Sequence, residues 1–311
     1  MKSFAAKLAC ILSLLSSSYA FADDGQADVG AWSIGINAGL GQRSAFITGQ
    51  DDLDIYLLPD IHYYGEQFFF DNGTLGYTLS EQQDFAFSLI GELNPYGLYF
   101  EQSAFGESFN SLYLLNSRSI AGESSEANSE QPNGLVTTDP NSLVFGTSEE
   151  PSIGDHFSGD VYNLPKPDLS IDVGVQGNWF FSDNQSITVK LVKDVSSKHS
   201  GFRAKFNWSM HQRIAQVKLN LSLGFDWLSE DASNYYFGIS PQSPEFAGRG
   251  YKTGSSTNPF VAITGSYPIS KKLSLVAHLK YLKLDADIAD SPITSESYTL
   301  THFAGIHYKF W

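Results

Sequence analysis

The chain has 311 residues, a formal net charge of −15 and a single cysteine. An acidic balance of this size disfavours nucleic-acid binding. A mean hydropathy of −0.17, without an apolar run of about 18 residues, excludes a helical membrane span. Phe, Tyr and Gly are nevertheless abundant, with 23, 16 and 27 copies. This composition is typical of a transmembrane β-barrel, whose strands give a weak hydropathy signal; a large soluble β protein is the alternative.

The first 22 residues have the pattern of a secretory signal peptide. Basic residues precede a short apolar stretch, and Ala20-Phe21-Ala22 has the form of a cleavage site, so we expect cleavage between Ala22 and Asp23. Cys10 leaves with this leader, and the mature chain then has no disulfide and no cysteine-based metal site. We predict that residues 23–311 form a single outer-membrane barrel.

The first ten segments that read as strands alternate, fully or in part, between apolar residues and polar or small ones. They are 32–40, 55–63, 68–79, 85–93, 169–181, 187–191, 202–210, 217–227, 261–267 and 273–281. Pro59 indicates a bulge or a frayed pairing inside the second segment. Asp71-Asn72-Gly73 indicates a bulge inside the third.

The last stretch, Ser297 to Trp311, carries the clearest strand signal. From Tyr298 to Phe310 every second residue is mostly apolar, with aromatic residues at both ends, which indicates a lipid-facing side between two membrane interfaces. Tyr308-Lys309-Phe310 also resembles the C-terminal Tyr-x-Phe signature of bacterial outer-membrane barrels, with Trp311 as one extra residue. The edge strand of a soluble sandwich is the alternative.

The lengths of the connections set the strand number. Segments 182–185, 211–215 and 268–272 are short turns, and short turns face the periplasm in such barrels, where both chain ends must also lie. The strand number is then even, so eleven visible strands require a twelfth, which we place within Tyr96–Leu115, ahead of a long polar surface loop at about 106–167. The prediction is an all-β, antiparallel, up-and-down transmembrane barrel of about twelve strands with long outer loops; ten or fourteen strands are alternatives.

The residues that alternate with the lipid-facing set are predicted to line the lumen, acidic on one wall and basic on the other. The candidate lumen charges are Asp60, His62, Asp84, Glu92, Asp168, Asp172, Lys190, Arg203, Lys205, Lys218, His278, Lys280 and Lys309. They either pair across a narrow lumen or create a transverse field that filters small solutes; we favour pairing with partial hydration, because unpaired buried charges are costly. Asp60 and His62 share a strand face, but ordinary lumen residues explain them better than acid–base catalysis. We therefore predict no catalytic, metal or cofactor site.

Several stretches resemble the MipA/OmpV family of Gram-negative outer-membrane proteins. They are Leu58-Pro59-Asp60-Ile61-His62-Tyr63-Tyr64-Gly65 with Phe68-Phe69-Phe70, Leu75-Gly76-Tyr77, Lys193-Asp194-Val195-Ser196 with Gly201-Phe202, Asn234-Tyr235-Tyr236-Phe237-Gly238-Ile239-Ser240, Tyr267-Pro268-Ile269-Ser270 with Leu273-Ser274-Leu275, Tyr281, and Asp290-Ser291-Pro292. The 106–167 insertion departs from the family, which is usually shorter there. The resemblance implies an outer-membrane barrel; one member is described as a scaffold between a lytic transglycosylase (MltA) and a penicillin-binding protein, others as surface proteins or adhesins. The family has no established catalytic residues.

Three functions follow as hypotheses. The resemblance implies a structural or scaffolding barrel linked to cell-wall enzymes, with a periplasmic murein hydrolase and synthase as partners. The alternatives are a small-solute channel and a surface adhesin or recognition protein acting through the long outer loops. The acidic loop would lie among outer-membrane lipid and lipopolysaccharide. We expect no enzymatic activity and no nucleic-acid partner.

Overall fold

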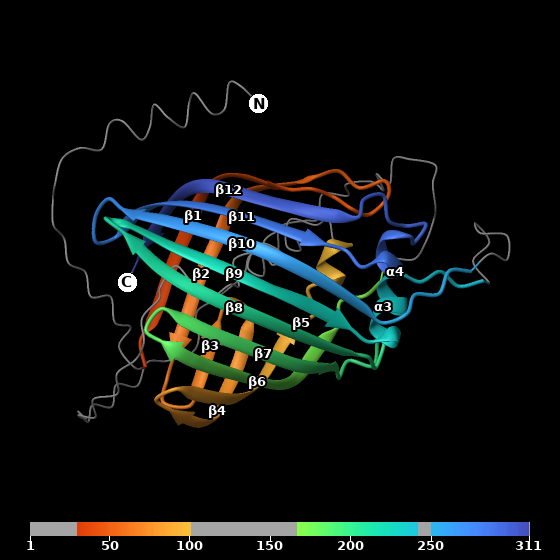
Figure 1. Ribbon diagram of the computed structural model, residues 1–311, viewed down its shortest axis with the longest axis horizontal. Coiled ribbons are helices and arrows are strands. Elements are labelled where there is room, and N and C mark those ends of the chain that lie inside the picture. The colour runs from red at the N-terminus through yellow and green to blue at the C-terminus, as the bar shows by residue number, and fades with distance from the viewer. Residues whose placement is uncertain (1–29, 101–166, 242–249, 311) are drawn as a thin grey trace, which may run out of the picture.

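The computed structural model describes residues 30–100, 167–241 and 250–310. In these ranges the chain forms a closed antiparallel barrel of twelve strands, with neighbours in sequence order and the first strand beside the last (Figure 1). The strands are β1 (Trp32–Arg43), β2 (Leu53–Tyr64), β3 (Phe68–Asp71), β4 (Thr74–Gln82), β5 (Phe85–Leu93), β6 (Ile171–Ser182), β7 (Gln185–Asp194), β8 (Phe202–Ile214), β9 (Val217–Leu228), β10 (Ser256–Pro268), β11 (Leu273–Lys283) and β12 (Tyr298–Lys309). The helices are η1 (Gly97–Tyr99), α3 (Glu230–Phe237) and α4 (Ala286–Ala289). The predicted fold is confirmed.

The two faces of β12 have the environments that the alternation predicts. Tyr298, Leu300 and Ile306 are exposed on the outer surface, while Thr299, Thr301 and Phe303 are buried inside. Period-two side-chain geometry places apolar residues toward lipid and polar ones toward the lumen. The strand pairs with β1 from Gly35 and Lys309 onward, which closes the wall without a free edge.

The twelfth strand does not arise where the sequence placed it. The segment 68–79 is two strands, β3 and β4, joined by a tight turn at Asn72 and Gly73, both of which have positive φ angles of 43° and 95°. Positive φ at both central residues is the geometry of the Asn-Gly hairpin turn, so the expected bulge was wrong. Residues 96–100 form η1 and its flanks instead of a strand. The rest of the segment 96–115, and the loop 106–167 up to residue 166, lie outside the described residues.

Pro59 marks the point where β2 loses its second neighbour. The β2–β3 ladder contains three residue pairs, from His62 to Tyr64. Asn72 extends it by one step, because its side-chain oxygen accepts from the N–H of Ile61 and its N–H donates to Ile61 O. Backbone groups of alternate residues point the same way in a strand, so Pro59, which has no N–H, falls at the first position without a partner on this side.

The barrel has two unlike ends. The short-turn end carries the connections 65–67, 83–84, 183–184, 215–216 and 269–272, and the long-loop end carries 44–52, 195–201, 229–255 and 284–297. Figure 1 shows α3 and α4 together at the long-loop end. No helix in the described ranges is long and apolar enough to cross a membrane.

Candidate functional site: the plugged mouth and the charged lumen

The long-loop end of the barrel is closed by a hydrophobic core, which we call the mouth plug. Each of its residues is at most 7% exposed, and they come from the β1–β2 loop, the segment after β5, α3, α4 and the ends of β9, β10 and β11. They are Phe46, Ile47, Tyr96, Phe100, Leu228, Ala232, Tyr236, Phe237, Phe260, Leu282, Leu284 and Ile288. Apolar side chains at this end of the lumen bury themselves by packing on one another.

The sequence contains the start and stop signals of α3, the central element of the plug. Ser229 is the N-cap, and its hydroxyl accepts from the N–H of Ala232. Glu230 and Asp231 lie in the first turn, where the helix dipole favours negative charge. The end of the helix is held against the β11–β12 connection, because the hydroxyl of Ser291 donates to Phe237 O at 2.6 Å.

The loop 195–201 supports α3 from below, and Asp194 organises this loop. The Asp194 carboxylate accepts from the backbone N–H groups of residues 196, 198, 199 and 200 and from the Ser196 hydroxyl. At the end of the loop, a Cβ on Gly201 would lie 2.6 Å from the N of Ala232, so only glycine permits the loop backbone to approach α3 this closely. The Lys193-Asp194-Val195-Ser196 stretch is therefore a loop-forming unit.

Replacing Asp194 with Asn should destabilise this loop. The amide keeps the shape of the side chain but removes its charge, and its NH₂ group then points at backbone N–H donors. A hydrogen bond to a charged group is worth about 1.5–3 kcal/mol, and we expect the unfolding free energy to fall by this amount. Hydrogen exchange of the amides at 196–200 should accelerate. Asp183→Asn, at an exposed turn position, should change the unfolding free energy by less than about 0.5 kcal/mol; equal effects of both variants would contradict the role of Asp194.

A chain of hydrogen bonds runs from this loop into the plug through His199. The N–H of Gly201 donates to His199 Nδ1 at 3.0 Å, and His199 Nε2 lies 3.2 Å from the Ser170 hydroxyl, which lies 2.9 Å from the Tyr236 hydroxyl. Because Nδ1 accepts, the proton of the neutral ring is on Nε2, which donates to Ser170. Burial lowers the pKa of His199 below its ordinary 6.5, against the opposing effect of Asp194 and Asp172.

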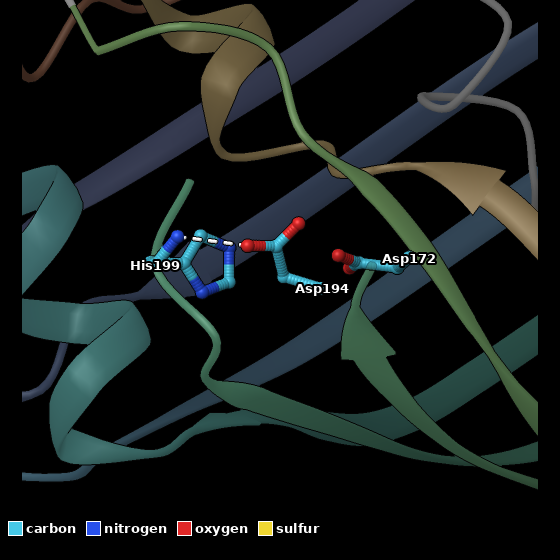
Figure 2. Close-up of side chains that lie close together, drawn as sticks. All are labelled: Asp172, Asp194 and His199. Carbon is cyan, nitrogen blue, oxygen red and sulfur yellow. Dashed lines mark hydrogen bonds between the residues drawn. The ribbon is translucent and has the colours of Figure 1, made fainter. Parts of the chain in front are cut away.

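Asp172, Asp194 and His199 lie close enough together to be considered as metal ligands. Figure 2 shows the Asp194 carboxylate between the other two side chains, with the backbone N–H of His199 donating to it. Both ring nitrogens of His199 are already used, as are both Asp194 oxygens. Only Asp172 Oδ1 has no partner. The donor set therefore fits a structural network better than a metal centre, which needs free lone pairs.

The lowered pKa of His199 makes the plug acid-sensitive. A group whose pKa is lower in the folded protein contributes stability that is complete above its unfolded value, near 6.5, and declines as the pH falls below it. Protonation also removes the Nδ1 acceptor for Gly201. As the pH falls below 6.5, we expect lower hydrogen-exchange protection in 195–201 and α3, measured relative to the intrinsic exchange rate at each pH, and we expect His199→Gln to flatten this pH dependence. An unchanged pH profile in the variant would contradict this assignment.

Below the plug lies a four-charge cluster, formed by Glu92, Asp172, Lys190 and Arg203. Glu92 binds Lys190 Nζ at 2.8 Å and also the Arg203 guanidinium, whose Nε lies 3.2 Å from Asp172 Oδ2. Glu92, Asp172 and Arg203 are at most 5% exposed, and Lys190 is 8% exposed. Two acids and two bases cancel, so the cluster neutralises itself inside the barrel. The pairs join β5 and β6 to β7 and β8, where the predicted acidic and basic walls meet.

Nearer the short-turn end is a second cluster around His62. Its Nε2 lies 2.8 Å from Asp60 Oδ1 and its Nδ1 lies 3.0 Å from Asp71 Oδ1, while His307 Nε2 lies 3.1 Å from Asp60 Oδ2. These contacts connect β2 to β3 and β12. Asp71 and His307 were not among the predicted lumen charges; His307 could have been found from its inward position on β12, but the face of Asp71 depended on the unrecognised hairpin.

The other predicted lumen charges do not join these clusters. Lys205 and Lys280 lie over the ring of Phe260, and His278 Nδ1 lies 2.8 Å from the Thr264 hydroxyl. Asp84 is exposed in the turn before β5, and Asp168 is exposed before β6 and pairs with Lys198. Lys218 and Lys309 lie toward the short-turn end, Lys218 exposed and Lys309 half-buried.

Comparison with known proteins shows the family of this chain. The family model described as MltA-interacting protein MipA matches residues 34–310. The putative outer membrane protein YiaT of Escherichia coli K12 is 26% identical over 179 residues, which is 57% of this chain and 73% of YiaT. The MltA-interacting protein of the same strain is 26% identical over 131 residues, 42% of this chain and 53% of that protein. The outer membrane protein OmpV of Vibrio cholerae is 22% identical over 153 residues, 49% of this chain and 59% of OmpV.

The similarity extends over most of the described barrel, including the stretches that form the plug and its supporting loop. The relatives are named as outer membrane proteins, and the structure is a barrel of the outer-membrane type. The protein is therefore located in the outer membrane, as predicted. The match to residues 34–310 shows that the chain belongs to the family of the MltA-interacting protein MipA.

Proposed function

We propose that this protein is a structural, scaffolding barrel linked to peptidoglycan enzymes, and that it is neither an enzyme nor an open pore at rest. The mouth plug is the observation that carries the proposal. Tyr236, Phe237 and Ile288 are at most 1% exposed in the long-loop mouth, and the four-charge cluster lies below them. A resting conduction pathway needs a hydrated lumen, whereas packed aromatic side chains exclude water.

The proposed partners follow from the family and from the accessible surface. One relative is named MltA-interacting protein, although the aligned region covers about half of it (53%). A periplasmic partner would contact the short-turn end, the end that faces the periplasm in such barrels. Exposed residues of both signs lie there, including Asp183 and Lys271. Contacts of this kind set the specificity and the rate of association.

The test is direct binding of the refolded chain, in lipid nanodiscs, to a purified lytic transglycosylase and a purified penicillin-binding protein. We expect saturable binding that the double variant Asp183→Lys, Lys271→Glu weakens about tenfold or more. The matched control reverses two exposed charges at the long-loop end, Asp51→Lys with Lys283→Glu, and should bind as the unmodified chain does. No binding to either enzyme, or equal effects of both double variants, would overturn the scaffolding role.

The small-solute channel and the surface-recognition protein are the remaining alternatives. Resolved single-channel steps of the unmodified protein in a planar bilayer would favour the channel and contradict the plug as a seal. Binding to host or cell-surface ligands through the long loops, without any enzyme binding at the short-turn end, would favour recognition. Silent insertions together with enzyme binding would support the scaffold.

A further inference from the structure

Two lysines inside the barrel have no carboxylate partner among the residues that the structure describes. Lys205 on β8 and Lys280 on β11 place their ammonium nitrogens 5.4 and 5.0 Å from the centre of the same ring, that of Phe260. Within the described part of the chain, no carboxylate oxygen lies within the 4.0 Å limit of an ion pair from either nitrogen. Both lysines are half-buried, and cation–π contact with a phenyl ring offsets only part of the cost of this partial removal of two ammonium groups from water.

The charges around these lysines leave an excess of positive charge. In the β-ladders, Lys205 lies directly opposite both Lys190 on β7 and Asp226 on β9. Glu92 already binds Lys190, and Asp226 makes no ion pair within the described residues. Among the described residues, one carboxylate therefore faces two ammonium groups that make no ion pair.

Strands β8, β9 and β11 also place buried polar atoms on the short-turn side of the two lysines. Three of these atoms have no hydrogen-bond partner among the described residues: Asn207 Oδ1, Asn220 Oδ1 and His278 Nε2. Buried polar atoms are almost always hydrogen-bonded, so water must satisfy these three. A small solute would then reach the two lysines from the short-turn end, because the mouth plug closes the other end.

We propose that Lys205 and Lys280 form a binding site for a small oxyanion, a phosphate or a carboxylate, beside Phe260 inside the barrel. The anion supplies the negative charge that the described residues lack there, and the ammonium groups donate charge-assisted hydrogen bonds to its oxygens. Asp226 limits the affinity by repulsion and restricts the site to anions that can stay clear of its carboxylate. The proposal does not depend on the scaffolding role, because it concerns the lumen and not the surface.

The test uses the refolded full-length mature barrel in detergent, titrated with inorganic phosphate or with acetate at constant ionic strength, with chloride as the reference. Calorimetry measures binding, and the melting temperature measures its linkage to folding. We expect phosphate or acetate to bind and to raise the melting temperature, and the stronger of the two identifies the preferred oxyanion. Lys205→Gln and Lys280→Gln should each weaken binding about tenfold or more, while Asp226→Asn should strengthen it.

Lys218→Gln is the matched control, because Lys218 is an exposed lysine on β9. It should bind the anion as the unmodified barrel does. Heat-dependent gel mobility reports whether each variant has folded, and Lys→Met replaces Lys→Gln at either position where the glutamine variant does not fold. No binding by the unmodified barrel, or equal binding by all the variants, would overturn the site.

Discussion

Replacing Tyr236 and Phe237 together with alanine should turn a silent barrel into a conducting one. Both side chains are at most 1% exposed in the mouth plug, and Phe237 contacts the rings of Phe46, Tyr96 and Phe100 at centroid distances of 6.0–6.1 Å. Removing a large buried aromatic side chain costs about 3–5 kcal/mol because it leaves a cavity, and a cavity lined by backbone and polar loops can fill with water. We expect resolved conductance steps in planar bilayers and a lower unfolding free energy.

The control for this experiment removes apolar side chains of the outer surface. Val261→Ala with Ile263→Ala shortens two lipid-facing residues of β10, which are 40% and 45% exposed, without touching the plug. This variant should remain silent in the bilayer. A plug variant that folds and still does not conduct would contradict the role of Tyr236 and Phe237 as the seal of the lumen.

Glu92→Gln should be the most destabilising single change in the lumen. Glu92 binds both Lys190 and Arg203, and Arg203 also binds Asp172, so the variant leaves two buried cations with a single carboxylate and one excess positive charge. Breaking a buried pair by removing one partner costs about 3–5 kcal/mol. Tryptophan fluorescence during guanidinium unfolding in lipid vesicles should report the loss. Glu81→Gln, at an exposed position of β4, is the control and should change the unfolding free energy by less than about 0.5 kcal/mol.

A double variant separates the loss of an interaction from the cost of an unpaired charge. Glu92→Met with Lys190→Met removes one acid and one base, so the interior stays neutral and Arg203 keeps Asp172. If unpaired charge is the cause, the double variant should be more stable than Glu92→Gln. A double variant that is less stable than the single one would show that the network contributes through its specific contacts.

The alternation of apolar and polar residues predicted the barrel, because successive side chains of each strand face lipid and lumen in turn. It did not reveal that Asn72-Gly73 forms a hairpin turn. The predicted number of twelve strands was therefore right, but the twelfth strand was placed in 96–115 and not in 68–79. α3 lies between the predicted strands 217–227 and 261–267 and was not predicted, although Ser229, the acids after it and Gly238 are standard helix signals. A helix of eight residues shows too little periodicity to stand out.

The site depended on contacts that no local pattern contains. The alternation predicted that Glu92, Asp172, Lys190 and Arg203 face the lumen. It did not predict which of these charges form ion pairs, because the pairs depend on the shear of the strands. The plug was missed because its residues come from four separate connections and three strand ends, and each is only an isolated aromatic or aliphatic residue in the sequence. The side chains of Asp194 and His199 accept hydrogen bonds from backbone N–H groups of their own loop. The sequence alone does not reveal such contacts.

The pairing of β1 with β12 also determines how the protein must mature. Gly35 and Lys309 meet in one ladder, so the wall closes only after nearly the whole barrel sequence is available. Closing so large a loop carries a high entropic cost and makes folding slow. Throughout this time the edges of both strands are open templates for pairing with other chains. The exported chain therefore needs a holding factor in the periplasm, or an assembly site that pairs its first strand temporarily, until β12 arrives.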